Sequence, residues 1–66
     1  MKLRIRELRE DSDLTQMQIA SYLHCDQSLY SKYERGEREL PLLLAVKLAD
    51  LYNVSMDYLI GRTEKR

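Results

Sequence analysis

The segment 14–36 constrains the fold most, because it holds two short helix patterns whose start signals lie close together. Thr15 opens a Thr-x-x-Gln sequence, in which its hydroxyl can accept from the amide of Gln18 while the Gln18 side chain returns to the amide of Thr15. This capping box predicts that a helix starts at Thr15. After a short break, Asp26 is expected to cap a second helix through its carboxylate.

Two helices joined by so short a turn are expected to cross steeply, which leaves the second helix projecting from the surface. Tyr30 and Tyr33 are i, i+3 partners on that helix and are expected to face inward. The opposite face then carries amides, hydroxyls and cations but no carboxylate: Gln27, Ser28, Ser31, Lys32 and Arg35. Because such groups suit base edges and phosphates, the segment indicates a helix-turn-helix that reads DNA.

Apolar residues recur at helical spacing in the rest of the chain, which predicts an all-α fold of five helices. A first helix is expected from Leu3 to about Asp11. The polar residues in and just before it that are expected to be largely solvated are Lys2, Arg4, Arg6 and Glu10. Pro41 suits the first position of a fourth helix, which runs to about Tyr52.

The predicted ends of the last two helices depend on small polar residues. Asn53 can terminate the fourth helix in the left-handed conformation. Ser55 is expected to cap a short fifth helix that Gly61 stops, and the tail 62–66 is expected to be frayed. These elements predict a single domain over residues 1–66, with its helix-turn-helix core at 15–35.

Composition bounds the class of protein. A chain of 66 residues makes one domain that buries only about 60% of its unfolded surface. No apolar run approaches the roughly 18 residues of a membrane span, and no secretory signal opens the chain, so a soluble cytoplasmic protein is expected. The one cysteine cannot form an internal disulfide.

Net charge is zero, from 11 Lys plus Arg against 11 Asp plus Glu, which argues against nucleic acid unless the charges are unevenly distributed. Lys32, Arg35 and Arg38 lie on or just after the projecting helix. The carboxylates Asp11, Asp13, Asp50 and Asp57 lie in other segments. Binding to DNA is therefore expected, but it should be weaker and less dependent on salt than the binding of a strongly basic domain.

Enzymatic functions fail on the residue inventory. The one histidine and the one cysteine, His24 and Cys25, are adjacent and cannot form a nucleophile and base pair with an orienting third group. No metal site and no glycine-rich phosphate loop are visible, so no metal and no cofactor are expected. The five tyrosines lie at helical spacings that favour core packing over base stacking, least clearly for Tyr22.

Several motifs distributed over nearly the whole chain resemble one known family. They are Leu14-Thr15-Gln16, Ile19-Ala20, Ser31-x-Tyr33-Glu34-x-Gly36, Pro41, Leu48-Ala49 and Asn53-Val54-Ser55-x-Asp57-Tyr58-Leu59. Together they resemble the lambda-repressor/Cro-like helix-turn-helix regulators, also called the Xre family, of bacteria and phages. The resemblance implies a five-helix domain that works as a homodimer on a two-fold double-stranded DNA operator, with the third helix in the major groove.

The resemblance also implies roles for single residues. It places Gln16 and Arg35 against phosphates, and Gln27, Ser28 and Lys32 on base-reading positions. Leu29, beside them, either contacts a thymine methyl or packs on Gln27. Arg9 and Glu34 match positions that form an ion pair between the first and third helices in relatives. The alternative is two ordinary surface charges.

Two positions depart from the family pattern. His24 stands where glycine is usual, so the turn is expected either to carry positive-φ strain on the order of 1 kcal/mol or to be slightly altered. Leu42, Leu43 and Val46 make the fourth helix apolar nearly all round, which favours a dimer interface over chance exposure of single residues.

The predicted function is thus a small homodimeric repressor that binds double-stranded DNA. The alternative is a protein-interaction module, such as an antitoxin or a partner-binding subunit, in which DNA contact is secondary.

Overall fold

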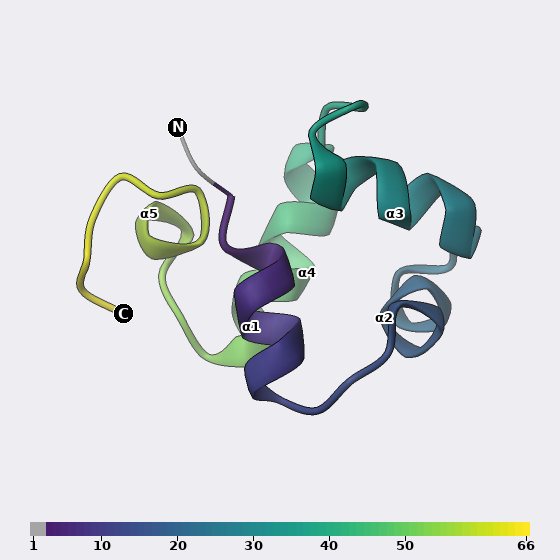
Figure 1. The fold of residues 1–66 in the computed structure, drawn as a ribbon. Coiled ribbons are helices and arrows are strands. Elements are labelled where there is room, and N and C mark those ends of the chain that lie inside the picture. Colours follow the sequence, from purple (N-terminus) through teal and green to yellow (C-terminus); the bar gives the residue numbers. More distant parts are fainter. Residues whose placement is uncertain (1–2) are drawn as a thin grey trace.

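The computed structural model describes residues 3–66, and these contain five helices and no strand (Figure 1). The helices are α1 (Ile5–Asp11), α2 (Gln16–Leu23), α3 (Gln27–Arg35), α4 (Leu42–Tyr52) and α5 (Met56–Leu59). The all-α prediction and the order of its elements are confirmed. Lys2, expected in solvent, lies outside the described residues.

Two predicted helix starts are confirmed by their hydrogen bonds. At α2 the amide of Gln18 donates to Oγ1 of Thr15 at 3.1 Å, and the amide of Thr15 donates to Oε1 of Gln18 at 2.8 Å. At α5 the amide of Tyr58 donates to Oγ of Ser55 at 3.0 Å. Both caps pair side chains with amides three residues away, so local sequence is enough to specify them.

Other helix starts differ from the prediction. The Asp26 side chain makes no capping hydrogen bond, although the backbone at that residue is extended, as at an N-cap. Asp26 is exposed, so water can solvate the first amides of α3 in place of the carboxylate. Pro41 is the N-cap of α4 and not its first helical residue, because its ψ of 146° is extended. α1 begins at Ile5 and not at Leu3, and the amide of its N-cap residue, Arg4, donates to the carbonyl of Leu59 at 2.9 Å.

Within residues 3–66, three residues other than glycine adopt the left-handed conformation, each at or just after the end of a helix. His24 and Asn53, both expected in that region, have φ of 59° and 55° and end α2 and α4. Asp13, in the turn after α1, has φ of 58° and was not anticipated. His24 therefore carries the predicted backbone strain between α2 and α3.

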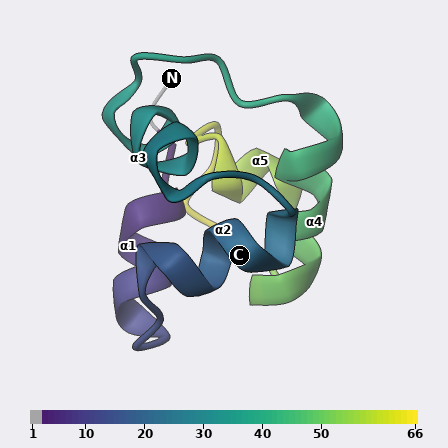
Figure 2. The ribbon, with the colours of Figure 1, turned by 90° about the vertical axis from the view of Figure 1, so that its right-hand side faces the viewer.

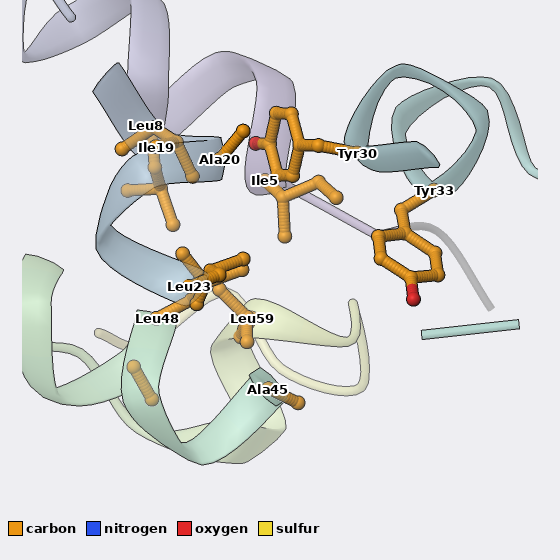
Figure 3. Packing of buried hydrophobic residues seen from close by; sticks show 11 residues of the cluster. Ile5, Leu8, Ile19, Ala20, Leu23, Tyr30, Tyr33, Ala45, Leu48 and Leu59 are labelled. Carbon is orange, nitrogen blue, oxygen red and sulfur yellow. The ribbon is translucent and has the colours of Figure 1, made fainter. Parts of the chain in front are cut away.

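In the described part of the chain, residues 3–66, eleven buried side chains form a core that joins all five helices. They are Ile5, Leu8, Ile19, Ala20, Leu23, Tyr30, Tyr33, Ala45, Leu48, Ala49 and Leu59. Figure 3 shows Leu23, Leu48 and Leu59 gathered at the centre, with the Tyr30 ring beside Ala20 and Ile5. The inward direction of Tyr30 and Tyr33 is confirmed, whereas Tyr22 is exposed.

The prediction that Arg4 is solvated is wrong. Its side chain is only 11% exposed, and its guanidinium lies 4.3 Å from the centre of the Tyr58 ring. Arg4 Nε donates to the carbonyl of Tyr58 at 3.1 Å, and Nη2 donates to that of Thr63 at 3.2 Å. These partners lie more than fifty residues further along the chain, beyond the reach of a helical periodicity argument. They also hold part of the tail 62–66, whose fraying stays a prediction.

Candidate nucleic-acid interface

α2 and α3 cross steeply, as the short turn requires: in Figure 1 α3 runs across the view while α2 is seen end-on, and Figure 2 reverses these directions. The turn is held by its backbone, since the amide of Cys25 donates to the carbonyl of Ala20 at 2.9 Å. The left-handed His24 allows the chain to reverse direction there. The predicted helix-turn-helix geometry is present, with α3 at one side of the molecule.

One shallow hollow is lined by all six residues that the sequence predicts to contact DNA. They are Gln16, Gln27, Ser28, Ser31, Lys32 and Arg35. Four of them are exposed, and Gln16 and Ser31 are half-buried. The structure thus brings the N-terminus of α2 and the outer face of α3 into one polar surface, called the α3 face below, that contains no carboxylate.

Behind this surface, the predicted ion pair between Arg9 and Glu34 is confirmed. Arg9 Nε donates to Glu34 Oε2 at 2.7 Å, and Nη2 donates to Oε1 at 3.3 Å. The side chains are only 12% and 3% exposed. Arg9 Nη1 also donates to the carbonyl of Leu14 at 2.9 Å. One arginine therefore ties α1 both to α3 and to the chain that leads into α2.

Gln16 joins the same network, which the sequence did not reveal. Its Nε2 donates to Oε1 of Glu34 at 3.0 Å. Burial alone would raise the pKa of Glu34, but hydrogen bonds from Arg9 and Gln16 outweigh it and hold the pKa below its ordinary value. The hydrogen bond to Glu34 raises the pKa of Arg9. Glu34 is thus a buried carboxylate, charged at neutral pH, that connects α1, α2 and α3.

Two buried tyrosine hydroxyls lie near this carboxylate. Within residues 3–66, neither the Tyr30 nor the Tyr52 hydroxyl makes a hydrogen bond that meets normal geometry. Burial raises the pKa of Tyr52 to about 12 and also raises that of Tyr30, on which Glu34 acts in the same direction. Both rings therefore stay neutral at neutral pH.

At the C-terminal end of α3, Arg35 is held by two neighbours. Its Nε donates to Oε2 of Glu37 and its Nη1 donates to Oγ of Ser31, both at 2.5 Å. Both members of the Arg35–Glu37 pair are about half exposed. The sequence analysis missed Glu37, although its spacing from Arg35 across Gly36, a favoured helix-ending residue, was a signal.

Leu29 is half-buried and packs against the core, a placement that neither sequence interpretation anticipated. Leu42, Leu43 and Val46 on α4 are 70%, 77% and 39% exposed. α4 therefore presents apolar side chains to solvent, as its sequence predicts.

Residues 3–66 contain no group of three or more His, Cys, Asp or Glu side chains able to hold a metal ion. His24 is exposed and Cys25 is half-buried. Burial raises the pKa of the Cys25 thiol, which opposes formation of a thiolate. In the same part of the chain, no helix has both the length and the apolar character needed to cross a bilayer.

Comparison with known proteins adds an independent observation. The profile of the helix-turn-helix family matches residues 5–59. The HTH-type transcriptional regulator ImmR of Bacillus subtilis is 39% identical over 61 residues, which cover 92% of this chain and 48% of that protein. The uncharacterized HTH-type transcriptional regulator YobD of Bacillus subtilis is 41% identical over 61 residues, with coverages of 92% and 54%.

A third relative is the cryptic phage CTXphi transcriptional repressor RstR of Vibrio cholerae. It is 33% identical over 61 residues, which cover 92% of this chain and 55% of RstR. The chain thus spans about half the length of the curated relatives it matches. No solved structure matches it.

Proposed function

The chain belongs to the helix-turn-helix family, which is a family of transcriptional regulators and not of enzymes, and from this premise we propose that it binds double-stranded DNA sequence-specifically. In this proposal it is a small homodimeric repressor, cytoplasmic and of bacterial or phage origin, that places α3 in the major groove. One observation carries the proposal. The six polar residues of the α3 face line a single hollow and contribute no carboxylate to it.

Within that face, Gln27, Ser28 and Lys32 would contact bases. A glutamine amide can bond adenine through two groups and a lysine can donate to guanine acceptors, each good contact discriminating by ~1–3 kcal/mol. Gln16 and Arg35 would contact phosphates. Ser31 would act through Arg35, whose guanidinium it helps to hold.

Dimerisation would double the number of contacts that such a small domain makes with DNA. Two copies related by a two-fold axis would place their α3 helices about 34 Å apart, one turn of DNA. The exposed Leu42, Leu43 and Val46 of α4 supply apolar surface that a second copy could bury. The assignment as a repressor draws on RstR, a relative that is named a transcriptional repressor.

Selection of bound fragments from random duplex DNA tests this function. We expect an enriched palindromic motif, which would establish sequence specificity and two-fold symmetry together. The variant Gln27→Ala/Lys32→Ala should then lose binding to that motif while keeping its fold. Lys47→Ala is the matched control, because it removes an exposed positive charge from α4 without touching the α3 face.

A protein-interaction module is the second candidate, favoured by the exposed apolar side chains of α4. In that case the α4 residues would contact a partner protein, and Gln27→Ala/Lys32→Ala would leave function intact. Failure to enrich any duplex motif would favour this candidate.

A further inference from the structure

Glu37 places a carboxylate at the edge of the α3 face, whose own polar groups are amides, hydroxyls and cations. Its position is built into the end of α3. Gly36, with φ of 76°, donates its amide to the carbonyl of Tyr33, and the amide of Glu37 donates to the carbonyl of Lys32 at 2.9 Å. This pair of bonds is a Schellman motif, which turns the chain back against the last turn of the helix.

The carboxylate fixed in this way occupies Arg35. Glu37 Oε2 accepts from Arg35 Nε, and the side chains remain 52% and 54% exposed, so neither is locked away from solvent. The hydrogen bond from Arg35, together with the charges of Arg35 and Lys32, holds the pKa of Glu37 below its ordinary value. One ionised carboxylate therefore acts on two of the cations proposed to meet DNA.

We propose that Glu37 competes with DNA phosphate for Arg35 and so lowers the affinity of the α3 face for duplex DNA of any sequence. This inference rests on the proposed function of that face. The oxygens of a carboxylate and of a phosphate accept from the same N–H groups of a guanidinium, so both anions cannot occupy Arg35 fully. Because phosphate contacts carry no sequence information, the penalty is the same for the operator and for random DNA.

Glu37 could also have the opposite effect on DNA binding. If Glu37 instead oriented Arg35 toward a phosphate, its loss would weaken binding. The exposure of the pair favours competition, since an exposed ion pair exchanges its partner at little cost. The sign of the change in affinity separates the two roles.

The test measures binding of a labelled random-sequence duplex and of the selected duplex by fluorescence anisotropy at several salt concentrations. Glu37→Gln keeps the size of the side chain and removes its charge. It should raise affinity for both duplexes by the same factor, roughly three- to tenfold. It should also steepen the slope of log affinity against log salt by about 0.9, one additional phosphate contact.

Glu39→Gln is the matched control, because Glu39 is an exposed carboxylate that makes no ion pair with any of residues 3–66. It removes the same charge and should change affinity less. In an Arg35→Gln background, Glu37→Gln should have little further effect, since the competition acts through that guanidinium. Circular dichroism checks that each variant is folded.

Unchanged or reduced affinity of Glu37→Gln, with the parent chain still binding duplex, would overturn the competition and leave the proposed function standing. An equal gain from Glu39→Gln would also overturn it, by assigning the effect to net charge alone. If neither the parent chain nor Glu37→Gln bound any duplex, the proposed function would fail and the competition with it.

Discussion

Two arginine–glutamate pairs, each with one member on α3, have the same chemistry and opposite surroundings. Arg9–Glu34 is almost fully buried and has the additional partners Gln16 and the Leu14 carbonyl. Arg35–Glu37 is half exposed and lies beside the surface proposed to meet DNA. The difference teaches that burial decides what such a pair does. A buried pair fixes a helix, because removing one partner leaves the other charge buried and unpaired. In an exposed pair, either side chain can exchange its partner for another ion at little cost.

The largest expected effect comes from breaking the buried pair. Arg9→Ala leaves the Glu34 carboxylate buried without its main partner, which should lower the free energy of unfolding by about 3–5 kcal/mol. DNA binding should fall with it, because α3 loses the ion pair that fixes it against α1. Urea denaturation and duplex binding of the same preparation measure both. Unchanged stability would show that the pair does not hold α3.

The second largest effect is expected from acid, which protonates Glu34 and so weakens the buried pair. The folded-state pKa of Glu34 lies below its ordinary value of 4.5, so its contribution to stability is present above that pH and is lost as pH falls through the folded pKa. Stability measured by urea from pH 7 to pH 3 should therefore decline in the acid range. Glu34→Gln should flatten that decline, and Glu37→Gln should flatten it less because solvent screens its pair. Equal flattening by both would contradict the distinction.

Removing the backbone strain at His24 should stabilise the fold without changing either arginine–glutamate pair. His24→Gly removes a side chain from a left-handed residue between α2 and α3 and should raise the free energy of unfolding by ~1 kcal/mol. Asn53→Gly is a control at the end of α4, where a similar φ is held by a residue type that tolerates it better. A lower melting temperature for His24→Gly would show that the turn carries no relievable strain.

The smallest expected effect on stability is that of breaking the exposed pair. Glu37→Gln should leave the free energy of unfolding nearly unchanged, because solvent screens the pair, although we expect it to change DNA affinity. Thermal denaturation followed by circular dichroism measures this change. A loss comparable to that of Arg9→Ala would erase the contrast between the two pairs.

The sequence predicted those features that depend on neighbours a few residues apart or on a whole-chain resemblance. The capping box at Thr15 and the cap at Ser55 are local, and the inward direction of Tyr30 follows from helical spacing. The pair of Arg9 and Glu34 spans 25 residues and came from the family resemblance. All six predicted contact residues line one hollow, while their contact with DNA stays a prediction.

The failures have physical causes. Arg4 was misplaced because the Tyr58 ring that covers it is a tertiary partner, invisible to periodicity. The Asp26 carboxylate can be replaced by water at an exposed helix start, so residue type alone did not decide its role. Glu37 was missed because its contact with Arg35 depends on the chain reversal at Gly36.

The central claim is that the outer face of α3 is the surface that binds DNA. Its most direct test is to record the backbone amide NMR spectrum of the isotopically labelled chain while adding the selected duplex. We predict that shifts concentrate on Gln16 and on α3 from Gln27 to Arg35. Shifts confined to α4 around Leu42 and Val46, or none at all, would contradict the claim.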